Sequence, residues 1–401
     1  MDLTALQAFM RESRIDAWLV HDFRGSSAVL ARLLPGKRWT TRRLTLHIPA
    51  VGVPTILVHA IDASQVGTPT LPGGEPVSPE VYLSWRDLHA WLARTLAGAR
   101  RVAMEYAPGC TLPVVSTVDA GTVELVRAVG VEVVSSADLI QVCLAVWSPE
   151  AERSHTLASV LVTRIKDDAF DFIRDHLRAG KKVTEVDVAR HMLAGFAAAG
   201  LEPQGGPVVA VNAHSGDPHY APLDAAEAGR PPTPVRRGDW ILIDLWARLP
   251  GEANIFSDIT WVAFAGDRIP DEHARVFAVV KAARDAAVTR VRSAWAAGEP
   301  IQGWQLDDAA RDVIVAAGHE RGVRHRTGHS LSAGPLVHGL GVNLDNLETH
   351  DTRAMLPGVG FTVEPGIYGD DFGVRLEINM HMHPDRGPVV TSCIQDEVVL
   401  V

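Results

Sequence analysis

Two aspartates occupy neighbouring strand-like stretches in the middle of the chain. Asp244 interrupts the mostly apolar run at residues 240–246, and Asp258 lies among isoleucines and aromatic residues at 255–264. The Pro250-Gly251 pair between them is a turn signal, so the segment is predicted to form a β-hairpin. A carboxylate inside a buried strand is unfavourable unless a cation or hydrogen bonds compensate it. The hairpin is therefore predicted to offer two oxygen ligands to one point, although aspartates near a turn can also simply face solvent.

More acids and imidazoles of the same kind follow downstream. The motif HRTGHS contains His325 and His329, FTVEPGIY contains Glu364, and VRLEIN contains Arg375 and Glu377. One imidazole and four carboxylates in separate strand-like runs is the ligand mixture that suits two divalent ions sharing carboxylates. We therefore favour a metal centre over an accidental placement of all five positions.

The order and surroundings of these residues resemble a known family. Asp244, Asp258, His329, Glu364 and Glu377 occur in that order, with Pro-Gly after Glu364 and an arginine two positions before Glu377. The pattern resembles the metallopeptidases that include methionine aminopeptidase, aminopeptidase P, prolidase and creatinase. It is most similar to the prolidase branch, the Xaa-Pro dipeptidases.

The resemblance implies an α+β architecture that is called the pita-bread fold, in which two helix pairs cover one face of a curved antiparallel sheet. Residues 147–401 would form this catalytic domain. Residues 1–146 are similar to the smaller α/β amino-terminal domain of creatinase and prolidase. The segment Trp147-Ser148-Pro149-Glu150 marks the boundary, because Ser before Pro-Glu is a helix-start signal.

The resemblance also implies a role for each candidate ligand. Asp258 and Glu377 would bridge two metal ions, Asp244 would bind one ion, and His329 with Glu364 would bind the other. Two cations held close together make a bridging water acidic enough to attack a peptide carbonyl. Glu364 would accept the proton of that water and pass it to the leaving nitrogen.

Further residues match positions that contact substrate or support the ligands in the family. His219 in DPHY and His338 in PLVHGLG match two histidines that hydrogen-bond the substrate, although either one alone could be a surface or core histidine. Arg375 and Tyr368 match an arginine and a tyrosine of prolidase-like members. Arg375 could pair with a substrate carboxylate or brace a metal ligand, and we prefer the second role. Thr260 matches a hydroxyl that fixes a ligand carboxylate.

The chain also departs from the family pattern near the candidate site. Asp244 and Asp258 are 14 positions apart, and His338 lies nine positions after His329. Both intervals are longer than is usual. Other positions carry unusual residue types: Trp246 and Ser330 where glycine is common, Asn379 where an acid is common, and Trp147 where lysine is common. These departures suggest a reshaped pocket wall and leave the ligand set complete.

Composition limits the remaining choices. The chain has 401 residues, enough for two domains, and 47% of them are hydrophobic and 21% charged. A net charge of −10 without a basic run argues against nucleic acid as a partner. Three widely spaced cysteines, Cys110, Cys143 and Cys393, indicate no disulfide framework. With no signal peptide and no run of about 18 apolar residues, we expect a cytoplasmic protein without membrane spans.

Periodicity places the elements around these motifs. For the amino-terminal domain the sequence predicts helices at 3–14 and 136–146, strands at 15–21, 44–49, 55–59, 102–106 and 131–134, and a loop at 67–79. For the catalytic domain it predicts helices from Pro149 to about Leu177, at 184–199, at 271–297 and at 305–317, and a strand at 207–211.

The leading hypothesis is a dinuclear-metal peptidase that cleaves the bond before proline, most of all in Xaa-Pro dipeptides. An aminopeptidase P that acts on longer peptides is the near alternative. A creatinase-like hydrolase and a metal-free binding module are weaker, because both would be expected to lose ligands. Oxygen-rich ligation favours Mn²⁺, with Co²⁺, Fe²⁺ or Zn²⁺ also suitable. The resemblance implies a homodimer that forms through the amino-terminal domain.

Overall fold

The computed structural model describes residues 2–36 and 38–401. The chain forms two compact units, Met1–Leu144 and Ala145–Val401. The first unit contains a six-stranded sheet in the order β4-β3-β2-β1-β5-β6, in which only β2 runs against its neighbours. Its elements are α1 (Leu3–Glu12), β1 (Ala17–Phe23), α2 (Ala28–Leu33), β2 (Arg43–Pro49), β3 (Thr55–His59), α3 (Ala63–Val66), β4 (Ser78–Tyr82), α4 (Trp85–Thr95), β5 (Arg101–Met104), α5 (Ala120–Arg127), β6 (Glu132–Ser135) and α6 (Ala137–Ile140).

This unit has the α/β character that the sequence predicts, but the sequence did not predict helices α2 to α5 or strand β4. The predicted loop at 67–79 ends early, because Ser78 begins strand β4, which pairs with β3. β4 is an edge strand, and proline is tolerated there because its missing backbone N–H can fall on the side that has no neighbouring strand. The predicted helix at 136–146 is short, since α6 ends at Ile140 and continues as a wider π-helical turn to Ala145.

The second unit contains two long helix pairs and the candidate site residues. Its helices are α7 (Pro149–Arg178), α8 (Glu185–Ala198), α9 (Pro222–Glu227), α10 (Asp271–Ala297) and α11 (Gly303–Ala316). Ser148 caps α7 through the Ala151 amide, and Thr184 forms a capping box with Asp187 at the start of α8. The helix-start signals in the sequence therefore hold in the structure.

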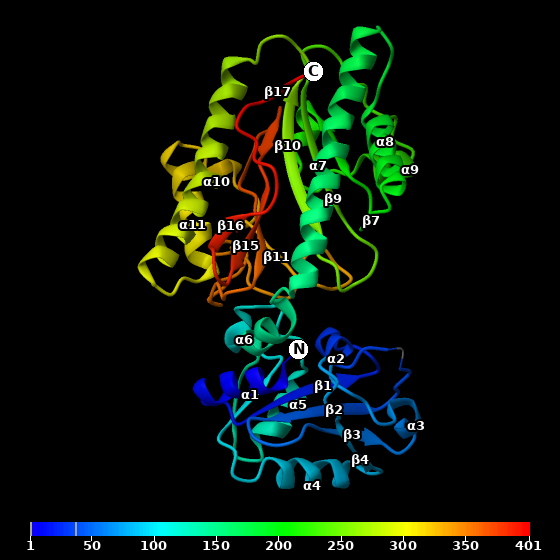
Figure 1. Cartoon of the computed structure of the whole chain (residues 1–401), viewed down its shortest axis with the longest axis vertical. Helices are drawn as coiled ribbons and strands as arrows, with labels where there is room; N and C mark the ends of the chain where they lie inside the picture. Colours follow the sequence, from blue (N-terminus) through cyan, green and yellow to red (C-terminus); the bar gives the residue numbers. More distant parts are fainter. Residues whose placement is uncertain (1, 37) are drawn as a thin grey trace. The chain divides into compact units, whose positions relative to one another are not determined.

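The strands of this unit form two main sheets (Figure 1). One sheet has the order β17-β10-β9-β7, with β8 also paired to β9, and the other has the order β11-β12-β15-β16. The strands are β7 (Glu202–Pro203), β8 (Val208–Val211), β9 (Trp240–Arg248), β10 (Ser257–Phe264), β11 (Ser330–Leu331), β12 (Gly360–Val363), β13 (Gly366–Tyr368), β14 (Gly373–Arg375), β15 (Ile378–His383), β16 (Gly387–Val390) and β17 (Val399–Leu400). β13 and β14 pair with each other.

Hydrogen bonds join the two main sheets between β10 and β15. The Asn379 side chain donates to the Asp258 carbonyl at 2.5 Å and accepts from the Asp258 amide at 3.0 Å. The Glu377 amide donates to the Thr260 carbonyl at 3.1 Å. This seam of hydrogen bonds holds β10 beside β15, so that Asp258 and Glu377, one from each sheet, lie close together.

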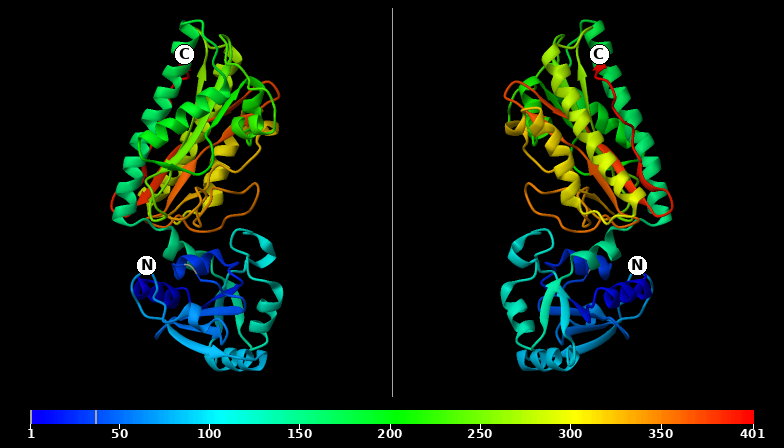
Figure 2. Two further views of the ribbon diagram at one scale, coloured as in Figure 1. Left: turned by 90° about the vertical axis from the view of Figure 1, so that its right-hand side faces the viewer. Right: turned by 90° about the vertical axis from the view of Figure 1, so that its left-hand side faces the viewer.

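The first helix pair covers one face of the β9–β10 hairpin. The long helix α7 runs beside both strands (Figure 1, Figure 2), and its Val162 and Ile165 share a core with Ile243 and Ile259. Because side chains alternate along a strand, Asp244 lies on the opposite face from Ile243. The apolar face of the hairpin therefore holds the helices while the other face carries the aspartates.

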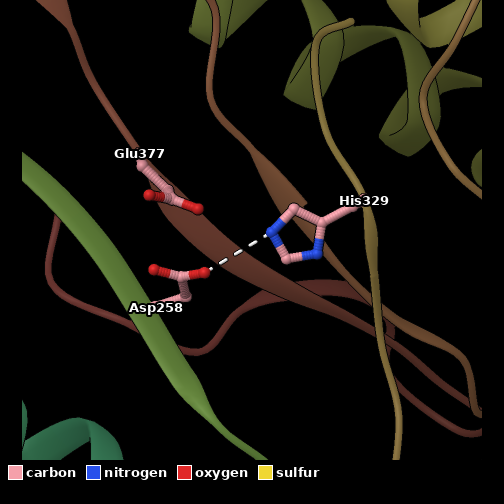
Figure 3. A group of neighbouring side chains, drawn as sticks. All are labelled: Asp258, His329 and Glu377. Atoms are coloured by element: carbon pink, nitrogen blue, oxygen red, sulfur yellow. Dashed lines mark ion pairs between the residues drawn. The ribbon is translucent and has the colours of Figure 1, made fainter. Parts of the chain in front are cut away.

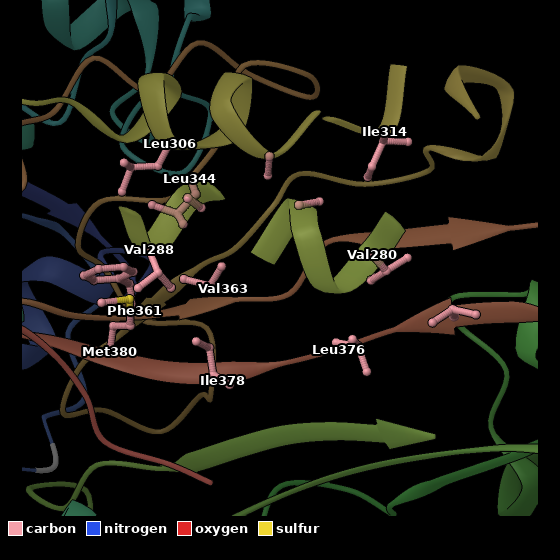
Figure 4. Packing of buried hydrophobic residues seen from close by; sticks show 14 of the residues in the cluster. Val280, Val288, Leu306, Ile314, Leu344, Phe361, Val363, Leu376, Ile378 and Met380 are labelled. Atoms are coloured by element: carbon pink, nitrogen blue, oxygen red, sulfur yellow. The ribbon is translucent and has the colours of Figure 1, made fainter. Parts of the chain in front are cut away.

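The second helix pair packs on the second sheet. Figure 4 shows Val288 of α10 beside Phe361 of β12, and Val280 of α10, Ile314 of α11 and Ile378 of β15 belong to the same apolar cluster. All five side chains are buried. Each helix pair thus stabilises one of the two sheets that supply the candidate ligands, and the predicted α+β class is confirmed.

No helix within the described residues is long and apolar enough to cross a membrane. Cys110, Cys143 and Cys393 are all free thiols.

Candidate active site

The β9–β10 hairpin presents three polar side chains on its inner face. Asp244 of β9 lies directly opposite Thr260 of β10, and Asp258 lies opposite Trp246. The pairs are antiparallel, so positions two apart along each strand share a face. The strand alternation that buries Ile243 and Ile259 under α7 therefore directs both aspartates to the other side. The predicted hairpin is confirmed, and both aspartates line the same cavity; their role as metal ligands stays a prediction.

The second sheet brings the other three candidate ligands to the same place. His329 directly precedes β11, Glu364 directly follows β12, and Glu377 directly precedes β15. The His329 Nε2 atom lies 3.4 Å from Asp258 Oδ2 and 3.7 Å from Glu364 Oε1. Ligand atoms of Asp258, His329 and Glu377 all lie within 4.8 Å of one another, and Figure 3 shows the three side chains pointing toward a common centre.

The hydrogen bonds of His329 fix how its ring faces this centre. Its Nδ1 lies 3.1 Å from the carbonyl of Ser330, which can only accept a hydrogen bond. We therefore assign the ring proton to Nδ1, which leaves the Nε2 lone pair directed at the carboxylates. The His329 amide also donates to Thr362 Oγ1 at 3.0 Å. This tautomer is the one that a metal-binding imidazole needs.

The electrostatics of the cluster call for a cation. One oxygen each of Asp244, Asp258 and Glu377 is buried without a hydrogen-bond partner among the described residues. Burial, reinforced by the negative charge of neighbouring carboxylates, raises the pKa of Asp258 and of Glu377 well above the ordinary range. Burial also raises the pKa of Glu364. Divalent cations prefer carboxylate oxygens and would satisfy these orphaned atoms, so the donor set fits a metal centre.

Arg375 braces the cluster from behind. Its guanidinium donates to Asp244 Oδ2 at 2.5 Å, to Thr260 Oγ1 at 3.1 Å and to the Tyr368 hydroxyl at 2.9 Å. Thr260 in turn donates to Glu377 Oε2 at 2.9 Å. One buried arginine therefore orients two candidate ligands, which supports the bracing role that we preferred from the sequence.

Tyr368 lies behind the ligands, away from the cavity described below. Its side chain is buried, and its hydroxyl sits 2.6 Å from His325 Nε2 as well as accepting from Arg375. Burial raises the pKa of Tyr368 to about 12, so it stays protonated. Substrate contact by Tyr368 or Arg375 is a prediction that this arrangement does not favour, because both side chains are engaged with protein groups.

His325 is a member of this network whose role the sequence did not reveal. Its Nδ1 lies 2.6 Å from the Arg326 carbonyl, so Nε2 is left to accept the Tyr368 proton. Burial lowers the pKa of His325 to about 4, which keeps the ring neutral. The chain His325–Tyr368–Arg375–Asp244 therefore connects the loop before His329 to the middle of β9. The only signal in the sequence was a second histidine four positions before His329.

Two departures from the family pattern have structural roles. Asn379 uses its amide to bind both backbone groups of Asp258, a task for which an acidic side chain lacks the donor. Trp147 donates from Nε1 to the Leu331 carbonyl at 2.7 Å and stacks on His381 at 4.5 Å. A side chain at Gly360 would overlap the Trp147 ring, so the glycine is required there.

A cavity of about 810 Å³ opens in front of the ligand cluster. Asp244, Asp258, His329, Glu364 and Glu377 all line it, and so do the predicted substrate-contacting residues His219, His338 and Arg375. Its wider wall is partly apolar, with Pro207, Val208, Tyr220, Leu223, Trp246 and Val337, and partly charged, with Asp224, Arg324, Arg326 and Glu348.

His338 and His219 have different positions in this cavity. The His338 ring lies 4.0 Å from the His329 ring, centre to centre. The His329 imidazole and burial lower the pKa of His338 to about 3, so His338 is neutral and can donate or accept one hydrogen bond. His219 is exposed, and its amide donates to Asp217 Oδ1 at 3.0 Å. Both rings are free to meet a ligand from the solvent side of the cluster.

Comparison with known proteins agrees with this geometry. The sequence pattern of Metallopeptidase family M24 matches residues 161–384, which is 224 of the 401 residues. A protein of Mycobacterium tuberculosis named probable dipeptidase PepE is 28% identical over 220 residues, 54% of this chain and 52% of that protein. The chain thus spans about half the length of the curated relatives it matches.

Solved structures extend the likeness in fold to the whole chain. Dipeptidase PepE from Mycobacterium ulcerans has a TM-score of 0.66 at 23% identity and covers 100% of this chain and 96% of its own. An X-prolyl aminopeptidase from Caenorhabditis elegans, described as a cytosolic enzyme with a di-nuclear active site, has a TM-score of 0.63 at 14% identity. The match covers 99% of this chain and 62% of that protein. The fold is that of the pita-bread peptidases, and the chain belongs to metallopeptidase family M24.

Proposed function

We propose that this metallopeptidase holds two divalent cations and cleaves the peptide bond before proline, with Xaa-Pro dipeptides as its main substrates. The observation that carries the proposal is the cluster of four carboxylates and one imidazole with three buried, unpartnered oxygens. One cation within bonding distance of Asp258, His329 and Glu377 leaves Asp244 Oδ1 without a partner. A second cation held by Asp244 would give this oxygen a partner.

In this proposal Asp258 and Glu377 would be shared by the two ions, Asp244 would hold one of them, and His329 with Glu364 would hold the other. Four carboxylates and one imidazole form a hard donor set, for which Mn²⁺ is the preferred ion among Mn²⁺, Fe²⁺, Co²⁺ and Zn²⁺. Arg375 and Thr260 hold the ligands Asp244 and Glu377 in place before any ion binds.

The side chains of the cavity divide the remaining work. Bound divalent cations supply Lewis acidity and make water acidic near neutral pH. Glu364 lines the cavity beside His329, where its carboxylate can take up a proton from water and release it to the leaving nitrogen. His338, neutral and beside His329, donates a hydrogen bond to the substrate carbonyl oxygen. His219 orients the substrate from the open side.

Proline fits this arrangement for two physical reasons. Its nitrogen carries no hydrogen, so a peptidase that must accept a hydrogen bond from that nitrogen cannot use it. Its fixed ring needs an apolar surface, which Val208, Trp246 and Val337 provide in the cavity wall. Glu364 supplies the proton that the departing proline nitrogen requires.

Preference for dipeptides rests on the charged part of the wall. Arg326 is paired with Glu348 at 3.1 Å, whereas Arg324 is exposed and has no ion pair recorded with any described residue. A free guanidinium at the cavity edge can pair with the carboxylate that a dipeptide carries directly after its scissile bond. The relatives named dipeptidase support this choice, and the X-prolyl aminopeptidase neighbour keeps cleavage of longer peptides as the second candidate.

The test is release of proline by metal-stripped protein, with and without Mn²⁺, from Gly-Pro and Ala-Pro beside an Ala-Pro-Pro tripeptide. Proline release that needs metal and disappears in Glu364→Gln supports the proposal. Glu124→Gln, an exposed change of the same chemistry in the first unit, is the matched control and should retain full activity. Faster cleavage of the tripeptide would favour the aminopeptidase P alternative, and no release with any divalent ion would favour a binding role.

We also propose a homodimer that forms through the first unit, and a cytoplasmic location, which the three free thiols support. Light scattering of the purified protein tests the dimer, because a mass near 43.2 kDa would mean a monomer.

A further inference from the structure

The segment that carries His338 is an extended loop, residues 332–341, between β11 and the following bridge at Leu344. Its lower part is held by two serines. Ser330 accepts the Gly341 amide on its hydroxyl at 2.9 Å, and Ser332 accepts the Leu340 amide at 3.1 Å. Ser330 stands where glycine is common in the family, and its hydroxyl holds the two ends of the loop together.

The far side of the loop is held by the lengthened β9–β10 hairpin. Arg248, at the end of β9, donates from Nη1 to the Gly334 carbonyl. The Gly334 amide donates to the Glu252 carbonyl in the hairpin turn at 2.8 Å. The Arg248 side chain is only 3% exposed and lies over the Phe256 ring at 4.6 Å. These contacts all come from the part of the hairpin that lies between Asp244 and Asp258.

A third contact lies next to His338 itself. The Val337 amide donates to Gln204 Oε1 at 2.5 Å, and the Gln204 carbonyl accepts the Trp246 Nε1 proton at 2.6 Å. Gln204 therefore links the loop to β9 through a residue that replaces the usual glycine. Trp246 and Val337 both line the cavity.

We propose that Gln204 and Arg248 are positioning residues that hold the 332–341 loop so that His338 faces the metal cluster and Val337 with Trp246 forms the proline-side wall. The inference rests on the proposed function for the role of His338. It makes the longer hairpin, the longer loop, Trp246 and Ser330 parts of one arrangement. Ser330 and the hairpin residue Arg248 bond the loop directly, and Trp246 is linked to it through Gln204.

The residues act through His338, and they do not touch the ligand cluster. Among the described residues, the recorded side-chain partners of Gln204 and Arg248 are Val337, Gly334 and Glu202, with Phe256 under the guanidinium. Their removal should therefore loosen the loop and spare the metal. This separates a positioning role from a general structural one, which would lower metal affinity as well.

The experiment compares Gln204→Ala with Gln204→Glu, which keeps an acceptor oxygen at the same reach. Gln65→Ala, an exposed change in the first unit, is the matched control. Three readouts are measured: hydrogen–deuterium exchange of the peptide 331–341, Mn²⁺ affinity by calorimetry, and kcat and KM on Ala-Pro. Arg248→Lys and Arg248→Met form a second pair that tests the other anchor.

For Gln204→Ala we expect faster exchange in 331–341, Mn²⁺ affinity within about twofold of wild type, and kcat/KM lower by about tenfold or more, because small displacements of a contacting group cost about 100-fold in rate. Gln204→Glu should recover most of the loss. If Arg248→Met fails to fold, the Gln204 pair carries the test, since Gln204 is only half-buried.

Unchanged exchange in 331–341, or faster exchange with unchanged kcat/KM, would overturn the inference. Parallel losses of Mn²⁺ affinity and of kcat/KM would also overturn it, because they would mean a general structural role. A wild type that releases no proline from any substrate would overturn the proposed function and the catalytic part of this inference, while the exchange comparison still decides whether the loop is held.

Discussion

Replacement of Arg375 by methionine should destabilise the metal-free protein strongly. Arg375 is 5% exposed, and its guanidinium meets Asp244 Oδ2 at 2.5 Å. At that separation the Coulomb attraction is about 7 kcal/mol for an effective dielectric constant of about 20, before desolvation is counted. Because removal of one partner from a buried ion pair costs about 3–5 kcal/mol, we expect the free energy of unfolding to fall by about that amount in Arg375→Met.

Metal should reduce this loss. Divalent cations compensate the same carboxylates that lose the guanidinium, so the difference between wild type and Arg375→Met should be smaller with saturating Mn²⁺ than in EDTA. Metal affinity of the variant should still be lower by about 10–100-fold, since an orienting group outside the ligand set has been lost.

The assay is urea unfolding in EDTA and in Mn²⁺, with calorimetry for the affinity. Arg375→Lys is the matched variant, because it keeps the charge and loses the three-way hydrogen bonding; it should lie between wild type and Arg375→Met. A metal-free Arg375→Met protein as stable as wild type would refute the reasoning, since the cluster would then need no internal cation.

Three further predictions concern stability. Burial raises the pKa of Glu105 from 4.5 to about 7. The contribution of Glu105 to the free energy of unfolding is therefore fully present below pH 4.5 and is lost as pH rises through 7. In unfolding experiments at several pH values, Glu105→Gln should remove about 3 kcal/mol of this pH dependence. Removal of metal with EDTA should lower the free energy of unfolding by about 2.7 kcal/mol relative to protein in metal at 100 times its Kd, and a smaller change in His329→Ala would confirm the ligand. Asn379→Asp should lower thermal stability by about 1–3 kcal/mol, because the Asp258 carbonyl loses its donor; an unchanged melting temperature would contradict this.

The sequence predicted those features that depend on local pattern. Helix α10 spans Asp271–Ala297, as the hydrophobic periodicity predicts, and α7 begins at Pro149, directly after its Ser148 cap. The β9–β10 hairpin was predictable because the Pro250-Gly251 turn signal separates two apolar, strand-like runs. Such features need only neighbours in sequence, and in these cases the tertiary contacts reinforce the local preference.

The features that the sequence did not predict depend on distant partners. Arg375 reaches Asp244 across 131 positions, and His325 meets Tyr368 across 43. Strand β4 takes its place from pairing with β3 in spite of Pro79. The effect of the longer hairpin was open for the same reason, since its contact with the 332–341 loop joins segments about 80 positions apart. The metal roles of the individual residues stay predictions until an ion is bound.

The seam between β10 and β15 has a consequence for how an ion would leave. Asp258 belongs to one sheet and Glu377 to the other, and Asn379 and the Glu377 amide join their backbones at this point. An ion shared by these two carboxylates would cross-link the two sheets at this seam. The rate of metal release would then depend on local opening between β10 and β15. Denaturant should increase this rate, whereas raising the concentration of a chelator that is already in excess should not.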